Sequence, residues 1–305
     1  MKNFIVILLA LVLYSCKKEI QTDVKDRKLK VVATTSQVAD LIKEIAGNAI
    51  VLEGLMGAGV DPHLYKASEG DVTKFYNADA IFYSGLHLEG KLEDVFEKMR
   101  HQGKVTVAVS DAISKSDLIS SADFASSYDP HFWFSITQWK KAATYVANEL
   151  SKLDVKNAEV YAKNVQSYIE KLTQLELKNI VQLEELPVEK RILVTAHDAF
   201  AYFGKTYDFK VVSLQGLSTA TEAGVQDVQR LSDFIIKHNI KAIFIESSVP
   251  VRTVEALQAA VRAKNHEVVI GGTLFSDALG NPNTKEGTYI GMYNYNMKTI
   301  IKALK

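Results

Sequence analysis

The sequence predicts an α/β protein of two similar lobes, each with a mostly parallel four-stranded sheet, bridged by one long α-helix. Three observations support this prediction. Short apolar runs rich in β-branched residues alternate with amphipathic segments. These runs fall into two groups of four, and a long stretch without glycine separates the groups. The length of 305 residues also favours two domains over one.

The first group of apolar runs predicts the strands of an N-terminal lobe. The runs are short and β-branched, which is typical of strands buried on both faces. The four predicted strands are Leu29–Thr35, Ile50–Met56, Ala80–Ser84 and Val105–Val109. The segments between them predict helices over Val38–Ala46, Glu69–Tyr76 and Leu88–Arg100. We assign residues 29–153 to this lobe.

A long helix is predicted next. No glycine occurs between positions 103 and 204, and no proline occurs between 130 and 187. Apolar residues recur at the four-three spacing of one helical face; they are Tyr161, Val165, Tyr168, Leu172 and Leu175. One helix over Val155–Glu185 would be roughly 45 Å long and would end before Pro187. We therefore expect residues 154–187 to link the lobes as a rod. The alternative is two shorter helices with a turn near Leu177–Asn179.

The second group of apolar runs predicts a C-terminal lobe of like build over residues 188–305. Its predicted strands are Arg191–Ala196, Lys210–Gln215, Ala242–Glu246 and Glu267–Ile270. Its predicted helices are Gln226–His238 and Arg252–Lys264. The order of strand and helix again favours a parallel sheet.

The first residues are typical of an export signal with lipid attachment. Lys2 precedes the apolar run Phe4–Tyr14, which is too short for a membrane span of about 20 residues. Cys16 follows it, and the four residues ending there resemble a bacterial lipobox. We expect residues 1–16 to be a lipoprotein signal peptide with lipidation of Cys16, and residues 17–28 to be a flexible tether. The alternative is an ordinary signal beside a buried core cysteine.

Charge and cysteine content exclude two classes of protein. Basic and acidic residues number 36 each, so the net charge is zero and nucleic-acid binding is not expected. Cys16 is the only cysteine, so no disulfide can form within the chain. The protein must be stabilised by its hydrophobic core. An anchored chain of this kind would lie outside the cytoplasmic membrane, in the periplasm or on the cell surface.

Four potential metal ligands follow predicted strands. The tripeptide Asp-Pro-His occurs twice and contains His63 and His131. His197 follows the fifth apolar run, and Asp277 follows the last one. Ligands of open α/β sheets bind beyond the carboxyl ends of the strands, and imidazole and carboxylate groups suit divalent transition metals. We therefore predict a metal site at the lobe interface, with two ligands from each lobe.

We predict a supporting role for the residues beside these ligands and do not expect the other histidines to bind the metal. Three aspartates beside the histidines are candidates to accept the ring N–H that does not face the metal; they are Asp61, Asp129 and Asp198. His87 follows a strand end and is a weaker ligand candidate, interpreted as a loop-packing residue. The remaining histidines lie in charged or helix-end contexts and are not expected to bind metal; they are His101, His238 and His266.

Five segments resemble one known family. They are Leu55–Tyr65, Asp129–Phe134, Thr195–Phe203, Ile245–Ser248 and Leu274–Asp277. In this order they resemble the metal-binding solute-binding proteins of ABC importers, cluster A-I, also called the TroA/ZnuA/PsaA-like family. The resemblance runs from about Leu29 to the end of the chain, and the TroA type is the most similar.

This resemblance implies a binding protein rather than an enzyme. It implies that His63, His131, His197 and Asp277 bind the metal between the lobes, and that a monomer delivers it to a permease with a cytoplasmic ATPase. Zn²⁺ is favoured, because manganese-type members tend to have glutamate where His197 stands and three imidazoles with one carboxylate suit zinc. Mn²⁺ stays possible, because Asp111–Asp129 lacks the histidines that many zinc members carry there.

The alternative is a zinc-dependent hydrolase with a three-histidine site. Such an enzyme would need an open fourth position for an activated water and a general base. No HExxH or comparable element occurs in the sequence.

Overall fold

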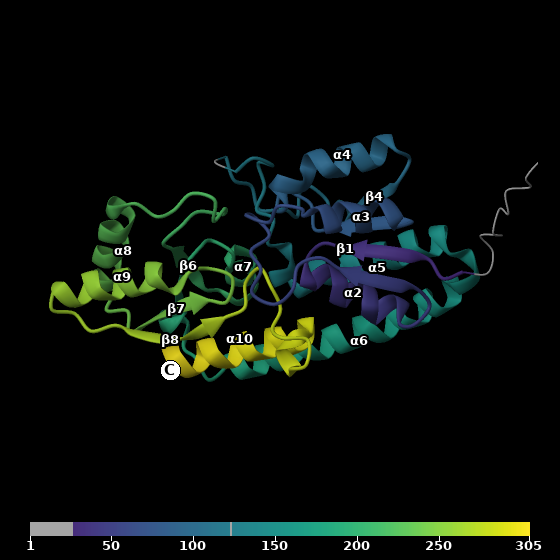
Figure 1. Cartoon of the computed structure of the whole chain (residues 1–305). Helices are drawn as coiled ribbons and strands as arrows, with labels where there is room; N and C mark the ends of the chain where they lie inside the picture. The colour runs from purple at the N-terminus through teal and green to yellow at the C-terminus, as the bar shows by residue number, and fades with distance from the viewer. Residues whose placement is uncertain (1–26, 123) are drawn as a thin grey trace, which may run out of the picture.

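The computed structural model describes residues 27–122 and 124–305. The predicted signal peptide 1–16, its Cys16 and nearly all of the predicted tether 17–28 lie outside the described residues. Figure 1 shows two lobes side by side, the N-terminal one in purple and blue and the C-terminal one in green and yellow.

The N-terminal lobe contains the predicted four-stranded parallel sheet. Its strand order is β2-β1-β3-β4. The strands are β1 Lys30–Ala33, β2 Val51–Gly54, β3 Ala80–Tyr83 and β4 Val105–Ala108. The helices are α2 Ser36–Ala46, α3 Glu69–Asn77, α4 Glu93–His101 and α5 Ile136–Leu153. Side chains satisfy the first free N–H groups of two helices: Thr35 accepts from Val38 at α2, and Ser68 and Asp71 form a capping box at α3.

Two features of this lobe differ from the sequence prediction. The helix expected from Leu88 begins as α4 only at Glu93, because Gly90–Leu92 form a 3₁₀ turn instead. These residues follow a turn in which Leu86 and His87 adopt left-handed backbone conformations. The buried carboxylate of Glu89 stabilises this turn by accepting from the N–H of Ser84 and of Gly85. The helix α5 was not predicted.

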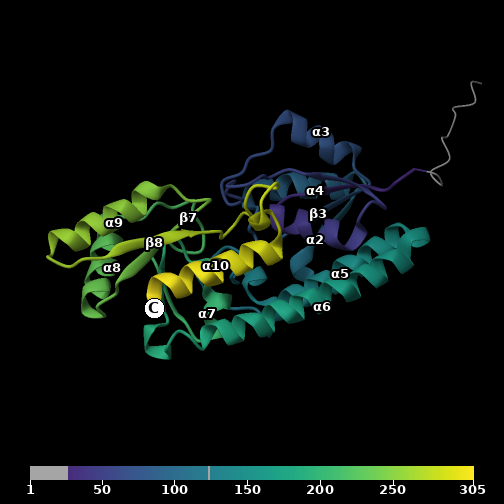
Figure 2. The ribbon, with the colours of Figure 1, turned by 90° about the horizontal axis from the view of Figure 1, so that it is seen from below.

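The long helix was predicted correctly as a single element. α6 runs from Ala158 to Leu183 and is preceded by a short 3₁₀ turn, Val155–Asn157. All five residues of the predicted apolar stripe are buried, and the alternative turn near Leu177–Asn179 does not occur. α6 packs against α5 and α2 of the first lobe and against α10 of the second, so it spans both lobes (Figure 2). In the described residues, no helix combines the length and apolarity that a membrane span requires.

The C-terminal lobe repeats the strand-helix alternation with a different pairing. Its strands are β5 Ile192–Thr195, β6 Lys210–Ser213, β7 Ala242–Glu246 and β8 Val269–Leu274. Its helices are α7 Ala201–Tyr207, α8 Val225–Lys237, α9 Val251–Ala263 and α10 Tyr289–Leu304. The expected four-stranded sheet is here two parallel pairs, β5-β6 and β7-β8, with β5 lying beside β7. The helices α7 and α10 were not predicted.

Two glycines explain why the last strand was predicted to end four residues too early, at Ile270 and not at Leu274. Gly271 and Gly272 break the apolar pattern, yet β8 continues through them to Leu274. The pairing with β7 shifts by one residue at this point, as in a β-bulge. Gly272 has a φ of 148°, and a side chain on Gly271 would lie 2.7 Å from the Ala303 methyl group. Glycine therefore allows both the bulge and the close approach of α10.

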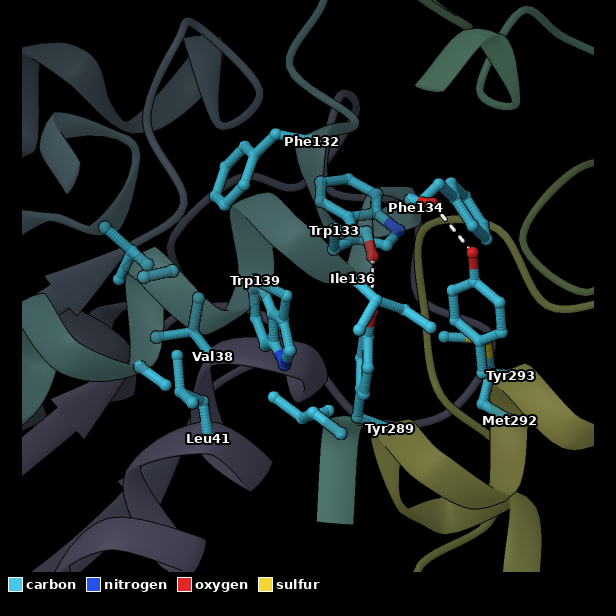
Figure 3. Packing of buried hydrophobic residues seen from close by; sticks show 14 of the residues in the cluster. Val38, Leu41, Phe132, Trp133, Phe134, Ile136, Trp139, Tyr289, Met292 and Tyr293 are labelled. Atoms are coloured by element: carbon cyan, nitrogen blue, oxygen red, sulfur yellow. Dashed lines mark hydrogen bonds between the residues drawn. The ribbon is translucent and has the colours of Figure 1, made fainter. Parts of the chain in front are cut away.

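The largest hydrophobic core joins the two lobes. It contains the aromatic residues after His131 and the tyrosines of α10, as Figure 3 shows. The hydroxyl of Tyr289 donates to the carbonyl of Trp133 at 2.6 Å, and that of Tyr293 donates to the carbonyl of Phe134 at 2.7 Å. Because these side chains are fully buried, the lobes are packed against each other around the segment that carries His131.

Candidate metal centre

The four predicted ligands come together at the interface between the lobes. His63 and His131 lie in loops after β2 and β4, and His197 and Asp277 lie just beyond β5 and β8. Their potential ligand atoms all lie within 4.8 Å of one another. All four residues are buried, with exposed fractions of 4% for His63 and 1% or less for the others. The carboxyl ends of the parallel strands thus bring together residues that are far apart in sequence.

Asp277 lies at the centre of this cluster. Its Oδ2 lies 3.1 Å from Nε2 of His197 and 3.9 Å from Nε2 of His63. Its Oδ1 lies 3.4 Å from Nε2 of His131. The three Nε2 atoms and both carboxylate oxygens have no hydrogen-bond partner in the described part of the chain. Such groups are costly to bury unless a cation satisfies them, and their nitrogen and oxygen donors suit a divalent transition metal.

Carboxylates on the other side of two rings fix which nitrogen faces the centre. Oδ1 of Asp129 lies 2.7 Å from Nδ1 of His131 and also accepts from the His131 backbone N–H. Glu246 takes a similar place beside His197: its Oε1 accepts the backbone N–H at 2.9 Å, and its Oε2 lies 2.6 Å from Nδ1 as an ion-pair contact. A carboxylate on Nδ1 directs Nε2 toward the metal and raises its basicity.

The predicted supporting aspartates take different roles. Asp129 contacts the ring of its histidine, as proposed. Asp61 contacts the backbone N–H of His63 and not its ring. Asp198 lines a neighbouring cleft, and the ring of His197 is paired with Glu246. Sequence reasoning did not assign Glu246; the available signal was one acidic residue ending the otherwise apolar run Ala242–Glu246.

The loop that carries Asp277 is held by the opposite lobe. The carbonyl of Ser276 accepts hydrogen bonds from Nε2 of Gln37 at 3.2 Å and from Nε1 of Trp133 at 3.1 Å. Ser36 accepts from the N–H of Leu279 at 2.8 Å. The position of Asp277 therefore depends on both lobes, which no local sequence pattern could indicate.

The cluster holds protons when no metal is present. Burial lowers the pKa of His63 to about 3, so that ring is neutral. Burial also opposes protonation of His131, but Asp129 and Asp277 outweigh it and raise the pKa of His131 to about 9. Asp277 and Glu246 likewise raise the pKa of His197 well above its usual value against the cost of burial. The two charged rings in turn hold the pKa of Asp277 well below its usual range, although burial opposes this.

The other histidines lie apart from the cluster. His87 contacts Glu93 at 2.6 Å and the ring of Phe124, which agrees with a loop-packing role. His101 is exposed and His238 packs on Phe234. His266 lies 3.3 Å from the carbonyl of Ile240.

Two α/β lobes packed along one long helix, with three imidazoles and a carboxylate buried between them, define a binding protein for a divalent metal. Residues 31–303 match the family described as zinc-uptake complex component A, periplasmic. The chain belongs to this family of metal-binding substrate-binding proteins of ABC importers.

Individual relatives resemble the chain over most of its length. The manganese-binding lipoprotein MntA of Bacillus subtilis is 48% identical over 280 residues, which are 92% of this chain and 91% of that protein. The zinc-binding protein TroA of Treponema pallidum is 47% identical over 279 residues, covering 92% and 90%. The solved structure of the periplasmic zinc-binding protein TroA from Treponema pallidum has a TM-score of 0.88 and covers 91% of this chain and 99% of its own.

A more distant solved structure has the same architecture. The Mn-bound periplasmic metal-binding protein of Candidatus Liberibacter asiaticus is 26% identical, with a TM-score of 0.78, covering 91% of this chain and all of its own. The family consists of binding proteins and not enzymes, so the hydrolase alternative is not supported.

Proposed function

We propose that this protein captures Zn²⁺ outside the cytoplasmic membrane and delivers it to an ABC permease, with Mn²⁺ as the second candidate. The proposed ligands are His63, His131, His197 and Asp277. The observation that carries the proposal is a group of buried Nε2 and carboxylate oxygen atoms that face one another and find no hydrogen-bond partner among residues 27–122 and 124–305. A dication would neutralise the carboxylate and satisfy all three rings.

The donor set favours zinc over manganese. Three imidazole nitrogens and one carboxylate match the four-coordinate site that Zn²⁺ prefers, and nitrogen donors bind Zn²⁺ more tightly than Mn²⁺. Manganese would require more oxygen ligands, which Asp277 can supply by binding through both oxygens. The names of two relatives, one zinc-binding and one manganese-binding, support keeping both metals.

We also propose how the chain is organised around this site. Residues 1–16 would form the lipoprotein signal region, with cleavage before Cys16, so that the lipidated Cys16 begins the mature chain and residues 17–28 follow it as a tether. Residues 29–153 and 188–305 would form the lobes, with 154–187 as the link. The protein would act as a lipid-anchored monomer. Mass spectrometry of the membrane-extracted protein tests the lipid on Cys16, and light scattering tests the monomer.

The metal assignment is tested by removing one proposed ligand. His63→Ala should weaken zinc binding by about a hundredfold or more, since one of four metal bonds is lost. Calorimetry with Zn²⁺ and then with Mn²⁺ in competition measures both affinity and preference. His101→Ala is the matched control, because this histidine is exposed and lies outside the cluster. Unchanged zinc affinity in His63→Ala would contradict the assignment.

A further inference from the structure

A hydroxyl group from the C-terminal lobe supports His63 through Asp61. Oγ1 of Thr219 donates to Oδ2 of Asp61 at 2.6 Å. The other oxygen of the same carboxylate, Oδ1, accepts from the backbone N–H of His63 at 2.9 Å. Thr219 and Asp61 are 158 positions apart and belong to different lobes. The threonine is only 7% exposed and Asp61 is half-buried, so this bond to a carboxylate is partly shielded from water.

The segment that carries Thr219 has little packing of its own. Residues 214–224 connect β6 to α8, and two clefts of about 570 Å³ and 490 Å³ border the segment. Phe124 and Asp198 line the first cleft, and Leu64 and Pro250 line the second. Most side chains of this segment are exposed or half-buried. The hydrogen bond to Asp61 is therefore a main attachment of this segment to the N-terminal lobe.

His63 is also the proposed ligand with the least support. A buried carboxylate contacts the ring of His131 and another contacts the ring of His197, whereas the described contact of Asp61 is with the backbone of His63. His63 is the most exposed of the four ligands, at 4%. A metal ion leaving the cluster would thus lose its bond to His63 before the others.

We propose that Thr219 is a positioning residue for His63 and sets how long the protein retains its metal. While the threonine hydroxyl holds Asp61, His63 stays directed at the metal. When residues 214–224 move away, Asp61 and His63 are freed together and the metal can leave. This inference rests on the proposed function, since it assumes a metal bound to His63.

The rate of zinc release tests this role. Zinc-loaded protein is mixed with an excess of a chromophoric chelator in a stopped-flow instrument. Thr219→Val keeps the shape of the side chain but removes the hydroxyl, and we expect release about tenfold faster, the change that loss of one hydrogen bond to a charged group produces. Thr219→Ser keeps the hydroxyl and should release zinc at the wild-type rate. Thr221→Val is the control, because Thr221 lies in the same segment but is exposed.

A double-mutant cycle separates this role from a general loss of stability. In an Asp61→Ala background, Thr219→Val should cause no further acceleration, because its partner is already absent. The chelator-treated variants should still melt in one cooperative transition, lowered by no more than the few degrees that loss of one hydrogen bond produces. Release from Thr219→Val at the wild-type rate, or equal acceleration in both backgrounds, would refute the role of Thr219. If the wild type binds neither zinc nor manganese, the proposed function itself fails; zinc binding with unaltered release refutes Thr219 alone.

Discussion

At the scale of single residues, charge balance determines what the cluster binds. Asp277 and the carboxylates behind His131 and His197 place more negative than positive charge around three imidazoles. Without a metal, protons on two rings compensate this charge. A dication replaces those protons and satisfies the same carboxylates, so proton and metal compete for one site.

This competition predicts proton release on metal binding. Zn²⁺ requires neutral imidazoles, and the pKa of His131 is about 9 with that of His197 also raised. At about pH 7.5 zinc should therefore displace roughly one to two protons, and its affinity should keep rising up to about pH 9. If the histidines had ordinary pKa values, the zinc affinity would stop rising with pH above about pH 6.5. Calorimetry in buffers of different ionisation enthalpy measures the number released, and a value of zero at this pH would contradict the charge balance.

That the four proposed ligands come together could be predicted from sequence, because each follows a strand end and two repeat one tripeptide. Of the groups that support them, Asp129 could also be predicted, because it neighbours His131 in sequence, but the supporting groups from the other lobe could not. Thr219 and Gln37 act across the lobe interface, and a hydrogen bond between positions far apart leaves no local pattern. Glu246 is an intermediate case. The sequence shows an acidic residue at the end of an apolar strand, but it does not indicate that this residue contacts His197.

At the scale of secondary structure, the elements that could be predicted are those with a repeating apolar pattern within their own sequence. The stripe on α6 repeats over many turns, so it determined one helix. The helix α10 was not predicted, because part of what stabilises its first turn comes from the other lobe and leaves no local sequence pattern. Oδ2 of Asp40, on α2, accepts from the backbone N–H of Tyr289 at 2.8 Å and thereby caps α10.

This contact predicts a pH-dependent contribution to stability. Burial raises the pKa of Asp40 to about 6, even though the bond to Tyr289 opposes the shift. The folded pKa thus lies above the unfolded value, so the free energy of unfolding from this group falls as pH rises from about 4 to about 6. Asp40→Asn keeps an acceptor for Tyr289 without ionising. Between about pH 4 and about pH 7.5, the free energy of unfolding of the variant should therefore rise by roughly 2–3 kcal/mol relative to that of the wild type.

Urea unfolding of both proteins with a chelator present measures this difference. The metal cluster titrates equally in the two proteins, so its contribution cancels. A stability difference between Asp40→Asn and the wild type that stays constant across this pH range would show that Asp40 ionises as it does in the unfolded chain.

At the scale of the whole molecule, the lobes are joined by packing as well as by the chain. One continuous core includes α2, α5, α6 and α10, and the tyrosines of α10 donate to carbonyls of the N-terminal lobe. A hinge that opens widely would have to expose these aromatic side chains. Metal entry and release are therefore expected to involve loops such as residues 214–224 and not a large rotation of one lobe.

The shared core also predicts how the protein unfolds. Because the main hydrophobic cluster is continuous through both lobes, they should melt together in one transition and not in two.

Bound zinc links residues of both lobes, and at a thousandfold excess over Kd it should add about 4 kcal/mol to the free energy of unfolding. Calorimetric scans with zinc and with chelator should then show one peak that moves several degrees upward with metal. In His63→Ala this shift should be much smaller, whereas His101→Ala should behave as the wild type. Two separate peaks would mean that the lobes unfold independently. A melting temperature that is the same with zinc and with chelator would mean that no metal binds tightly between the lobes.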